Sequence, residues 1–330
     1  MQTSRPDTIL PADVPFGESR RVVFRRFGGP EVLELETRPI PVPDDGQVRV
    51  RVLAAGVNPV DWKLFSGKPM RDPYERHLPS GNGYDFSGII DSVGVGVTGW
   101  APGDAVFGGL RYEAQADHLI VDPAQLARVP AGLDLIEAGA LNVVGRTAHA
   151  AVVSQQIQYG ETVLVSGAAG GVGFLTAQLC VAAGARVIGT ASRTWHDQLA
   201  AAGIHPVEYG PDLITRLRTL APQGIDAALD TVGHGTVETA LALGVDDRRI
   251  NTIADYDARE KYGVAGVGGA AAGVAELEEI GQRIAAGELT LPISATFGLE
   301  DVRCAYRASI QGHVHGKIVI TTGPSWPTAP

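Results

Sequence analysis

The spacing of hydrophobic positions changes once along this chain, near Leu135. Before that point, short apolar runs alternate with polar residues, and Gly and Pro separate the runs. In one run Val48, Val50 and Val52 alternate with arginines, which is typical of a strand that buries one face. The strands predicted in this part are 21–24, 32–36, 48–54, 88–97 and 103–107. Their number and spacing predict a compact β-barrel of roughly 130 residues.

After Leu135 the pattern first becomes helical, over an alanine-rich stretch that ends near Gln158. Short apolar runs and helical segments then alternate. The predicted strands are 162–166, 186–191, 206–208, 227–231 and 249–253. The helices predicted between and after them are 172–183, 194–202, 212–220, 236–242 and 275–286. This alternation predicts an α/β domain built on a doubly wound parallel sheet.

The last part of the chain returns to strand-like sequence from about residue 291, and its final apolar run is 316–320. We expect this end to rejoin the barrel, which makes the barrel domain discontinuous. The predicted barrel domain is formed by residues 1–140 and 291–330, and the parallel-sheet domain by residues 141–290.

Three other stretches lack a clear period. Residues 265–274 are rich in Gly and Ala, and we predict either a loop or a tightly packed segment there. Residues 1–18 are polar and residues 321–330 contain three prolines, so both ends are predicted to lack regular structure.

The parallel-sheet domain opens with a glycine-rich turn. Residues 163–173 read Val-Leu-Val-Ser-Gly-Ala-Ala-Gly-Gly-Val-Gly, and an apolar helical stripe follows as far as Gly184, where a helix C-cap belongs. Glycines permit a tight turn and let an anion approach the helix N-terminus, where free N–H groups and the helix dipole hold it. With a strand on each side, the turn predicts a dinucleotide site. A turn that binds nothing is the alternative, and the lack of Gly-Lys-Ser/Thr excludes a Walker A loop.

Composition narrows the function further. The chain has 330 residues, of which 45% are hydrophobic and 19% charged, and its net charge of −10 argues against nucleic acid as a partner. Its two cysteines, Cys180 and Cys304, form no Cys-x-x-Cys pair, so neither a disulfide framework nor a cysteine zinc site is indicated. No signal core and no membrane-length apolar stretch occur, and we therefore expect a cytoplasmic protein without a membrane partner.

Five motifs in this order resemble the zinc-independent quinone oxidoreductase branch of the medium-chain dehydrogenase/reductase superfamily. The motifs are Gly-Gly-Pro-Glu-Val-Leu at 28–33, Gly-Val-Asn-Pro-Val-Asp-Trp-Lys at 56–63, Ala-Ala-Gly-Gly-Val-Gly at 168–173, Asp-Ala-Ala-Leu-Asp-Thr-Val-Gly at 226–233 and His-Gly-Lys-Ile-Val at 315–319. The resemblance covers about residues 21–320. It implies a GroES-like barrel, a Rossmann domain and a cleft between them. It also implies reduction of quinones, enones or similar activated carbonyl compounds with NADPH, and a homodimer.

The preferred cofactor is also indicated by charge. Enzymes that use NAD place an Asp or Glu after the second strand, where it binds the ribose 2′-hydroxyl. Here that position reads Thr190-Ala191-Ser192-Arg193, without an acid. Arg193 and Ser192 can instead bind a 2′-phosphate, which favours NADPH. Tyr209 matches a family position that reaches the same phosphate, whereas a solvated surface arginine is the alternative for Arg193.

Zinc-dependent relatives carry a Cys in the segment that corresponds to residues 56–63, followed by a Gly-His-Glu. This chain has Asn58 in the first segment and Gly83-Tyr84-Asp85 in the second, so we predict a protein without zinc. Hydride transfer must then depend on positioning and on a hydrogen-bond donor near the substrate oxygen. Asn58, Lys63 and Tyr84 are the candidate catalytic donors, because the matching family segments face the cleft. A surface or packing role is the alternative for each.

The resemblance also implies a set of cofactor contacts. The predicted cofactor-binding residues are Asn58, Thr147, Ala169, Gly170, Gly171, Val172, Ser192, Arg193, Tyr209, Val232, Ile253 and Lys317. The predicted function is NADPH-dependent reduction of a small quinone or α,β-unsaturated carbonyl compound. Two rivals share the same nucleotide site: a pathway-specific enoyl or polyketide-type reductase, and a catalytically silent structural or sensing protein that binds NADPH.

Overall fold

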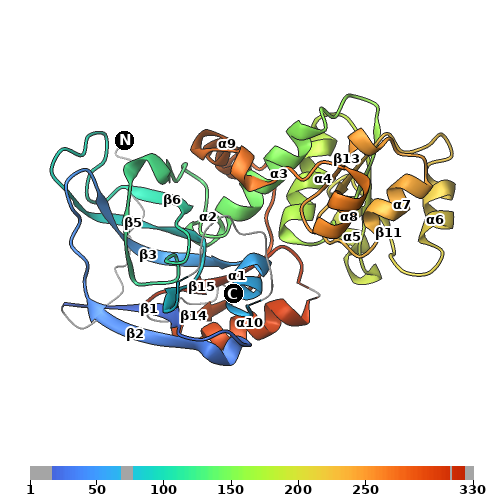
Figure 1. Cartoon of the computed structure of the whole chain (residues 1–330). Helices are drawn as coiled ribbons and strands as arrows, with labels where there is room; N and C mark the ends of the chain where they lie inside the picture. The colour runs from blue at the N-terminus through green and yellow to red at the C-terminus, as the bar shows by residue number, and fades with distance from the viewer. Residues whose placement is uncertain (1–16, 68–76, 313, 324–330) are drawn as a thin grey trace.

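The chain folds around three β-sheets, two in a barrel domain and one in an α/β domain, with helices between them (Figure 1). The computed structural model describes residues 17–67, 77–312 and 314–323. The two predicted irregular ends therefore lie mostly outside the described residues. Where they are described, Glu18 already begins the first strand and Thr321 still belongs to the last, a difference of one residue at each end.

The barrel domain consists of a seven-stranded and a three-stranded sheet. The larger sheet has the order β14 (Ile293–Gly298), β15 (Lys317–Thr321), β3 (Val48–Val57), β5 (Asp85–Val93), β6 (Ala105–Gly109) and β8 (Leu126–Arg128), with β7 (His118–Val121) also paired to β3. The smaller sheet has the order β2 (Leu33–Pro39), β1 (Glu18–Phe24) and β4 (Ser80–Gly81).

Strand β3 confirms the predicted alternation of buried and partly exposed side chains. Val48, Val50 and Val52 are almost completely buried, while the arginines between them are half-exposed. Strand β15 pairs antiparallel with β3, with Ile318 opposite Val57, so the C-terminal strands do join the sheet formed by the N-terminal part. The exact domain boundaries at residues 140 and 291 stay predictions.

The α/β domain contains a five-stranded parallel sheet. Its order is β11 (His205–Val207), β10 (Arg186–Thr190), β9 (Thr162–Val165), β12 (Ala227–Asp230) and β13 (Ile250–Thr252). Numbered from β9, this is the order 3-2-1-4-5, the core of a Rossmann sheet.

Helices cover both faces of that sheet. The α-helices in the described part of the chain are α1 (Pro59–Phe65), α2 (Leu135–Ala138), α3 (Leu141–Ser154), α4 (Gly171–Ala182), α5 (His196–Ala201), α6 (Leu213–Leu220), α7 (Thr236–Ala242), α8 (Tyr256–Tyr262), α9 (Val274–Ala285) and α10 (Val302–Gln311). Val163 and Val165 of β9 pack in a cluster with α4 and α5, whereas Leu164 packs in a second cluster with α6 and α7. The alternation of strand side chains therefore buries both faces, as a parallel sheet requires.

Three helices were not predicted from the sequence. Helix α1 has Asn58 as its N-cap, and the Asn58 backbone N–H donates to Asp61 Oδ2 at 2.8 Å in a capping box. Helix α8 is polar and buries only Ala258. Helix α10 occupies part of the end that was expected to be strand-like, and it buries Val302, Ala305 and Tyr306 at helical spacing. The helical stretch predicted from residue 135 to 158 is interrupted and forms two helices, α2 and α3.

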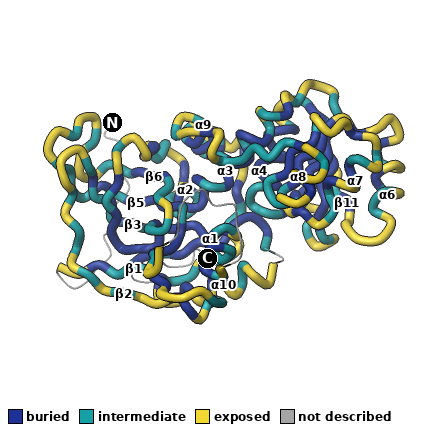
Figure 2. Tube along the Cα trace, viewed as in Figure 1, coloured by how far each residue is buried: buried dark blue, intermediate teal, exposed yellow. Residues whose placement is uncertain are grey.

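The two domains share one hydrophobic cluster. It contains Ala54 and Val319 from the barrel, Leu141 from α3, Leu175 from α4 and Ile280 from α9. Figure 2 shows the buried trace continuing from the barrel through α3 into α4, with the exposed residues concentrated in outer turns and helix faces. Apolar packing therefore holds the start of α4 close to the final barrel strand.

Candidate functional site

The glycine turn joins β9 to α4, and its glycines differ in the space around the position where a Cβ would lie. Gly167 has a φ of +59°, which a side chain resists. A Cβ on Gly173 would lie 2.2 Å from the Gly167 carbonyl oxygen, so this residue permits close packing of helix and turn. A Cβ on Gly170 would meet only that oxygen, at 3.4 Å, so Gly170 has the open approach that a pyrophosphate requires.

Gly171 lies against the barrel domain. A Cβ there would lie 2.9 Å from Lys317 Cδ and 3.1 Å from Val144 Cγ1. Gly316 of the barrel pairs with Gly170 in a parallel bridge, and the Gly316 N–H donates to the Ala169 carbonyl at 2.9 Å. Glycine at this position thus permits the domain contact.

A buried carboxylate links three strand ends beneath the turn. Asp230 Oδ1 accepts from Ser166 Oγ at 2.6 Å and from the Gly233 N–H at 2.9 Å, and Asp230 Oδ2 accepts from Thr252 Oγ1 at 2.6 Å. The Val232 N–H adds a fourth donor at 3.1 Å. The sequence interpretation did not assign these roles to Ser166, Asp230 and Thr252. The signal that could have found them is a polar residue at the carboxyl end of each of three parallel strands.

The predicted 2′-phosphate residues follow two paired strands. Thr190 of β10 lies opposite Val207 of β11, so the segments that carry Arg193 and Tyr209 leave the sheet side by side. Ser192 caps the short 3₁₀ helix η3 (Arg193–Trp195). Arg193 and Tyr209 are exposed, and no acidic residue follows β10 before Asp197. The Arg193 side chain has no hydrogen bond or ion pair with any residue that the structure describes.

The other predicted cofactor residues gather around the Gly- and Ala-rich segment 265–274. A Cβ on Gly268 would lie 3.6 Å from Ile253 Cγ2 and 3.9 Å from Thr147 Cγ2, and one on Gly269 would lie 3.0 Å from Thr147 Oγ1. The structure therefore brings Thr147 and Ile253 together and places a glycine between them. Val232 is exposed beside the glycine turn.

The segment is held in place by side chains that the sequence interpretation did not single out. The Asn251 amide donates to the Val267 carbonyl at 3.0 Å and accepts from the Val267 N–H at 2.7 Å. Arg146 Nε donates to the Ala272 carbonyl at 2.8 Å. These contacts fix the backbone of residues 265–274 next to Thr147. Of the two structures predicted for these residues, a loop or a tightly packed segment, the second is observed.

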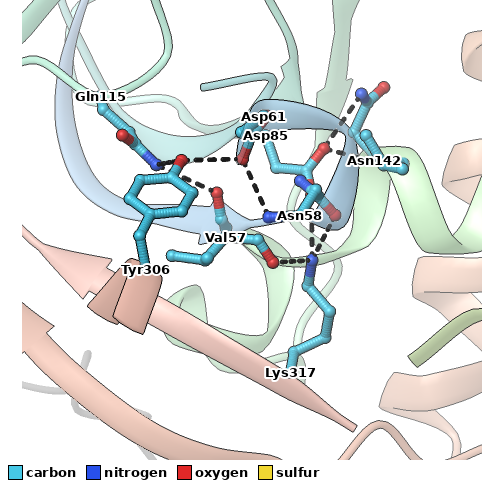
Figure 3. Close-up of polar contacts among 10 residues, drawn as sticks. Val57, Asn58, Asp61, Asp85, Gln115, Asn142, Tyr306 and Lys317 are labelled. Atoms are coloured by element: carbon cyan, nitrogen blue, oxygen red, sulfur yellow. Dashed lines mark hydrogen bonds and ion pairs between the residues drawn. The ribbon is translucent and has the colours of Figure 1, made fainter. Parts of the chain in front are cut away.

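A network of buried polar groups joins the catalytic candidate Asn58 to Lys317 (Figure 3). Lys317 Nζ donates to Asn58 Oδ1 at 2.5 Å and to the Val57 carbonyl at 2.8 Å, and it lies 3.6 Å from Asp85 Oδ2. Asn58 Nδ2 donates to Asp85 Oδ2 at 2.9 Å. Burial lowers the pKa of Lys317 below its usual value, and the carboxylates of Asp85 and Asp61 oppose that shift.

The start of α3 stabilises the carboxylate in this network. The Val143 backbone N–H donates to Asp85 Oδ1 at 2.8 Å, and Asn142 Nδ2 donates to the same oxygen at 3.2 Å. The N-terminal turn of a helix favours a negative charge. Asp85 is completely buried, so these donors and Lys317 are the groups that satisfy its oxygens in place of water.

A second buried carboxyl lies beside the first. Asp61 Oδ2 accepts from Tyr306 Oη at 2.9 Å, and the Tyr306 oxygen accepts from Gln115 Nε2 and Asn82 Nδ2, both at 2.8 Å (Figure 3). Asp61 Oδ1 is buried and has no hydrogen-bond partner in the described part of the chain. Burial, with a contribution from the nearby Asp85, raises the pKa of Asp61 to about 7.

The remaining catalytic candidates are less buried. Tyr84 is half-buried, its ring centroid lies 5.7 Å from that of Tyr112, and the Arg111 guanidinium lies 5.9 Å from the Tyr84 ring. Burial and the hydrogen bond with Tyr112 raise the pKa of Tyr84 above its usual value. Lys63, near the end of α1, is also half-buried, with Nζ 5.9 Å from the Trp62 ring centroid.

Related dehydrogenases carry zinc ligands in the segments that contain Asn58 and Asp85, and the absence of zinc from this chain stays a prediction. No group of three or more His, Cys, Asp or Glu side chains that could bind one occurs within residues 17–67, 77–312 and 314–323. The oxygens of Asn58 and Asp85, which lie in the corresponding segments, instead face the Lys317 ammonium. Lys317 Nζ thus already contacts the two oxygens that a metal ion at this place would need as ligands.

The fold and the site define a class of protein: a GroES-like barrel joined to a Rossmann domain, with a glycine-rich turn at their junction. Residues 44–157 match the alcohol dehydrogenase GroES-like domain, and residues 203–320 match the zinc-binding dehydrogenase family. The structure of the quinone oxidoreductase from Coxiella burnetii aligns with a TM-score of 0.82 at 27% identity, over 92% of this chain and 99% of that one.

Curated proteins give the same family. A quinone oxidoreductase of Pongo abelii is 38% identical over 237 residues, which are 68% of this chain and 69% of that protein. A synaptic vesicle membrane protein VAT-1 homolog-like of Mus musculus is 31% identical over 228 residues, which are 68% of this chain and 54% of that protein. This chain belongs to the quinone oxidoreductase branch of the medium-chain dehydrogenase/reductase superfamily. Among the described residues, no helix combines the length and the apolar character needed to cross a bilayer.

Proposed function

We propose that this protein reduces quinones or α,β-unsaturated carbonyl compounds by hydride transfer from NADPH, without a metal ion. The observation that carries the proposal is the buried group of Lys317, Asn58 and Asp85, which takes up the segments used for zinc in related dehydrogenases. The similarity to the Pongo abelii quinone oxidoreductase supports the substrate class.

The positive charge of Arg193, which follows β10, supports NADPH as the cofactor. Arg193 is exposed and has no carboxylate partner in the described part of the chain, so its guanidinium is available for a 2′-phosphate. The half-buried Ser192 can add a hydroxyl donor. An NAD site would need an acid here, and that acid would repel the phosphate.

The residues at the domain junction fit a dinucleotide. Gly170 offers open backbone at the start of α4, where a pyrophosphate would be held. Thr147, Ile253 and Gly268 would hold the nicotinamide end, because Thr147 and Ile253 both lie within van der Waals distance of a Cβ at residue 268. When bound, the nicotinamide supplies the hydride.

The protein must then stabilise negative charge on the substrate oxygen. Tyr84 is our first choice among the three candidates, because it is half-buried and its phenol has an O–H that can donate to the substrate oxygen. Asn58 is almost completely buried, with its carbonyl bound by Lys317 and one N–H bound by Asp85, so we assign it to positioning. Lys63 stays an alternative donor. Homodimer formation and a cytoplasmic location also stay predictions.

The test is NADPH oxidation against a quinone panel and an enone panel, before and after prolonged chelation. We expect turnover with at least one panel, and activity that chelation leaves unchanged. Stoichiometric zinc, with activity lost on its removal, would contradict the metal-free proposal. NADPH binding without turnover on either panel would instead support a silent sensor or a narrow pathway substrate.

A further inference from the structure

Three aromatic rings from three separate elements meet beside the glycine turn. The ring of His315, just before β15, stacks on Trp195 of η3, with centroids 4.8 Å apart and an interplanar angle of 22°. The edge of Phe174, on α4, meets the same imidazole at 5.0 Å and 67°. Both geometries are favourable arrangements for aromatic pairs. This contact joins the barrel side of the junction to the segment that follows β10.

The imidazole is also tied to the turn itself. His315 Nδ1 lies 2.8 Å from the Ala169 carbonyl oxygen, and His315 is 8% exposed. A carbonyl can only accept, so Nδ1 carries the proton in this contact. The same oxygen accepts the Gly316 N–H at 2.9 Å. The imidazole is therefore fixed by two rings and one hydrogen bond.

The stacking partner belongs to the element that carries Arg193. Helix η3 is three residues long, and the backbone bond from the Trp195 N–H to the Ser192 carbonyl, at 3.0 Å, closes it. So short a turn has little stability of its own. Trp195 anchors it, because its side chain packs on the core cluster around β9 and β10 and on His315.

We propose that Trp195 and His315 are positioning residues that hold η3 so that Arg193 meets the 2′-phosphate, and that the pair thereby sets the preference for NADPH over NADH. The inference rests on the proposed use of NADPH. It extends that proposal, because neither ring needs to touch the cofactor. His315 is two residues from Lys317, which binds Asn58, so one short segment of the barrel contacts both Asn58 and the η3 segment that carries Arg193.

Trp195→Ala removes the stack and leaves Arg193 in place. Calorimetric titration should show NADPH binding weakened about threefold to tenfold, the range expected for losing an aromatic pair, with NADH binding changed less than twofold. Trp195→Phe retains an aromatic ring and should keep most of the NADPH preference. Trp100→Ala, which removes a barrel tryptophan stacked on Arg128, is the matched control and should leave both affinities unchanged.

Variants of the imidazole separate stacking from hydrogen bonding. His315→Phe keeps a ring but loses the bond to Ala169, whereas His315→Ala loses both. The NADPH preference should survive in the first variant and fall in the second. Circular dichroism confirms that each variant is folded. Equal weakening of NADPH and NADH by Trp195→Ala, or no change in either, would overturn the inference, since a merely structural role does not discriminate between cofactors.

Arg193→Ala distinguishes failure of the inference from failure of the proposed function. If Arg193→Ala loses NADPH preference and Trp195→Ala keeps it, the positioning role is wrong and the NADPH assignment stands. If Arg193→Ala weakens both cofactors equally, the NADPH assignment and the inference both fall. If both the NADPH assignment and the positioning role are correct, the double variant Trp195→Ala/Arg193→Ala should bind NADPH only slightly more weakly than Arg193→Ala alone. Trp195 acts through the Arg193 side chain, which the double variant already lacks.

Discussion

Replacing Lys317 with methionine tests the buried charge network directly. Lys317 is 3% exposed and Asp85 is completely buried, so solvent screens neither charge. The substitution keeps an unbranched apolar side chain beside Gly171 and removes only the ammonium. Asp85 would then retain its donors Asn58, Asn142 and Val143 but lose its positive partner.

The expected cost follows from burial. Removing one partner of a buried ion pair destabilises a protein by about 3–5 kcal/mol, because the other charge remains without compensation. Because three hydrogen bonds still hold Asp85, we expect the lower end of that range. Asp85→Asn should cost a similar amount by leaving the Lys317 ammonium without a carboxylate. In the double variant neither member of the pair carries a charge, and the mismatched amide at residue 85 should cost only about 1–3 kcal/mol.

The assay is urea unfolding of the two single variants and the double variant, followed by far-ultraviolet circular dichroism. The two changes should be strongly non-additive, with a coupling energy of about 3 kcal/mol or more. Lys261→Met, at an exposed lysine of α8, is the control and should leave the unfolding midpoint unchanged. The reasoning is refuted if the losses simply add, or if Lys317→Met is as stable as the parent protein.

Three further outcomes are expected. Because the pKa of Asp61 is raised in the folded state, its bound proton stabilises the fold fully below about pH 4, and this stabilisation is lost as the pH rises through about 7. Asp61→Asn should therefore flatten the profile of unfolding free energy against pH between these values. An unchanged profile would show that another group titrates there. Gly170→Val should fold, because a Cβ at this position has only one atom within 4 Å, but it should bind both NADPH and NADH much more weakly. Unchanged affinities in a fluorescence titration with either cofactor would place the dinucleotide elsewhere. Arg193→Ala should weaken NADPH binding by about 1.5–3 kcal/mol and NADH binding far less, and equal losses in calorimetry would exclude a phosphate contact.

Local patterns in the sequence determined most of the architecture. The alternation in β3, the apolar run of β9 and the glycines after it depend on near neighbours, so they could be recognised before any tertiary contact was known. The absence of an acid after β10 is likewise a local property. Helix α10 had a recognisable helical spacing of Val302, Ala305 and Tyr306, but its strand-rich surroundings obscured it.

Tertiary structure alone decided how the site is assembled. Lys317 and Asn58 are 259 positions apart, and Tyr306 and Asp61 are 245 apart, yet each pair is hydrogen-bonded in the core. The sequence placed Lys317 among the cofactor contacts, whereas its ammonium is directed at Asn58 and the Val57 carbonyl. No local pattern encodes these pairings, because they depend on how β15 returns to β3 and how the barrel packs against α4. The sequence specifies the hydrogen-bonding groups and the charge of each side chain. It does not specify the partner, because a buried polar group must bind one of the groups that the tertiary structure places next to it.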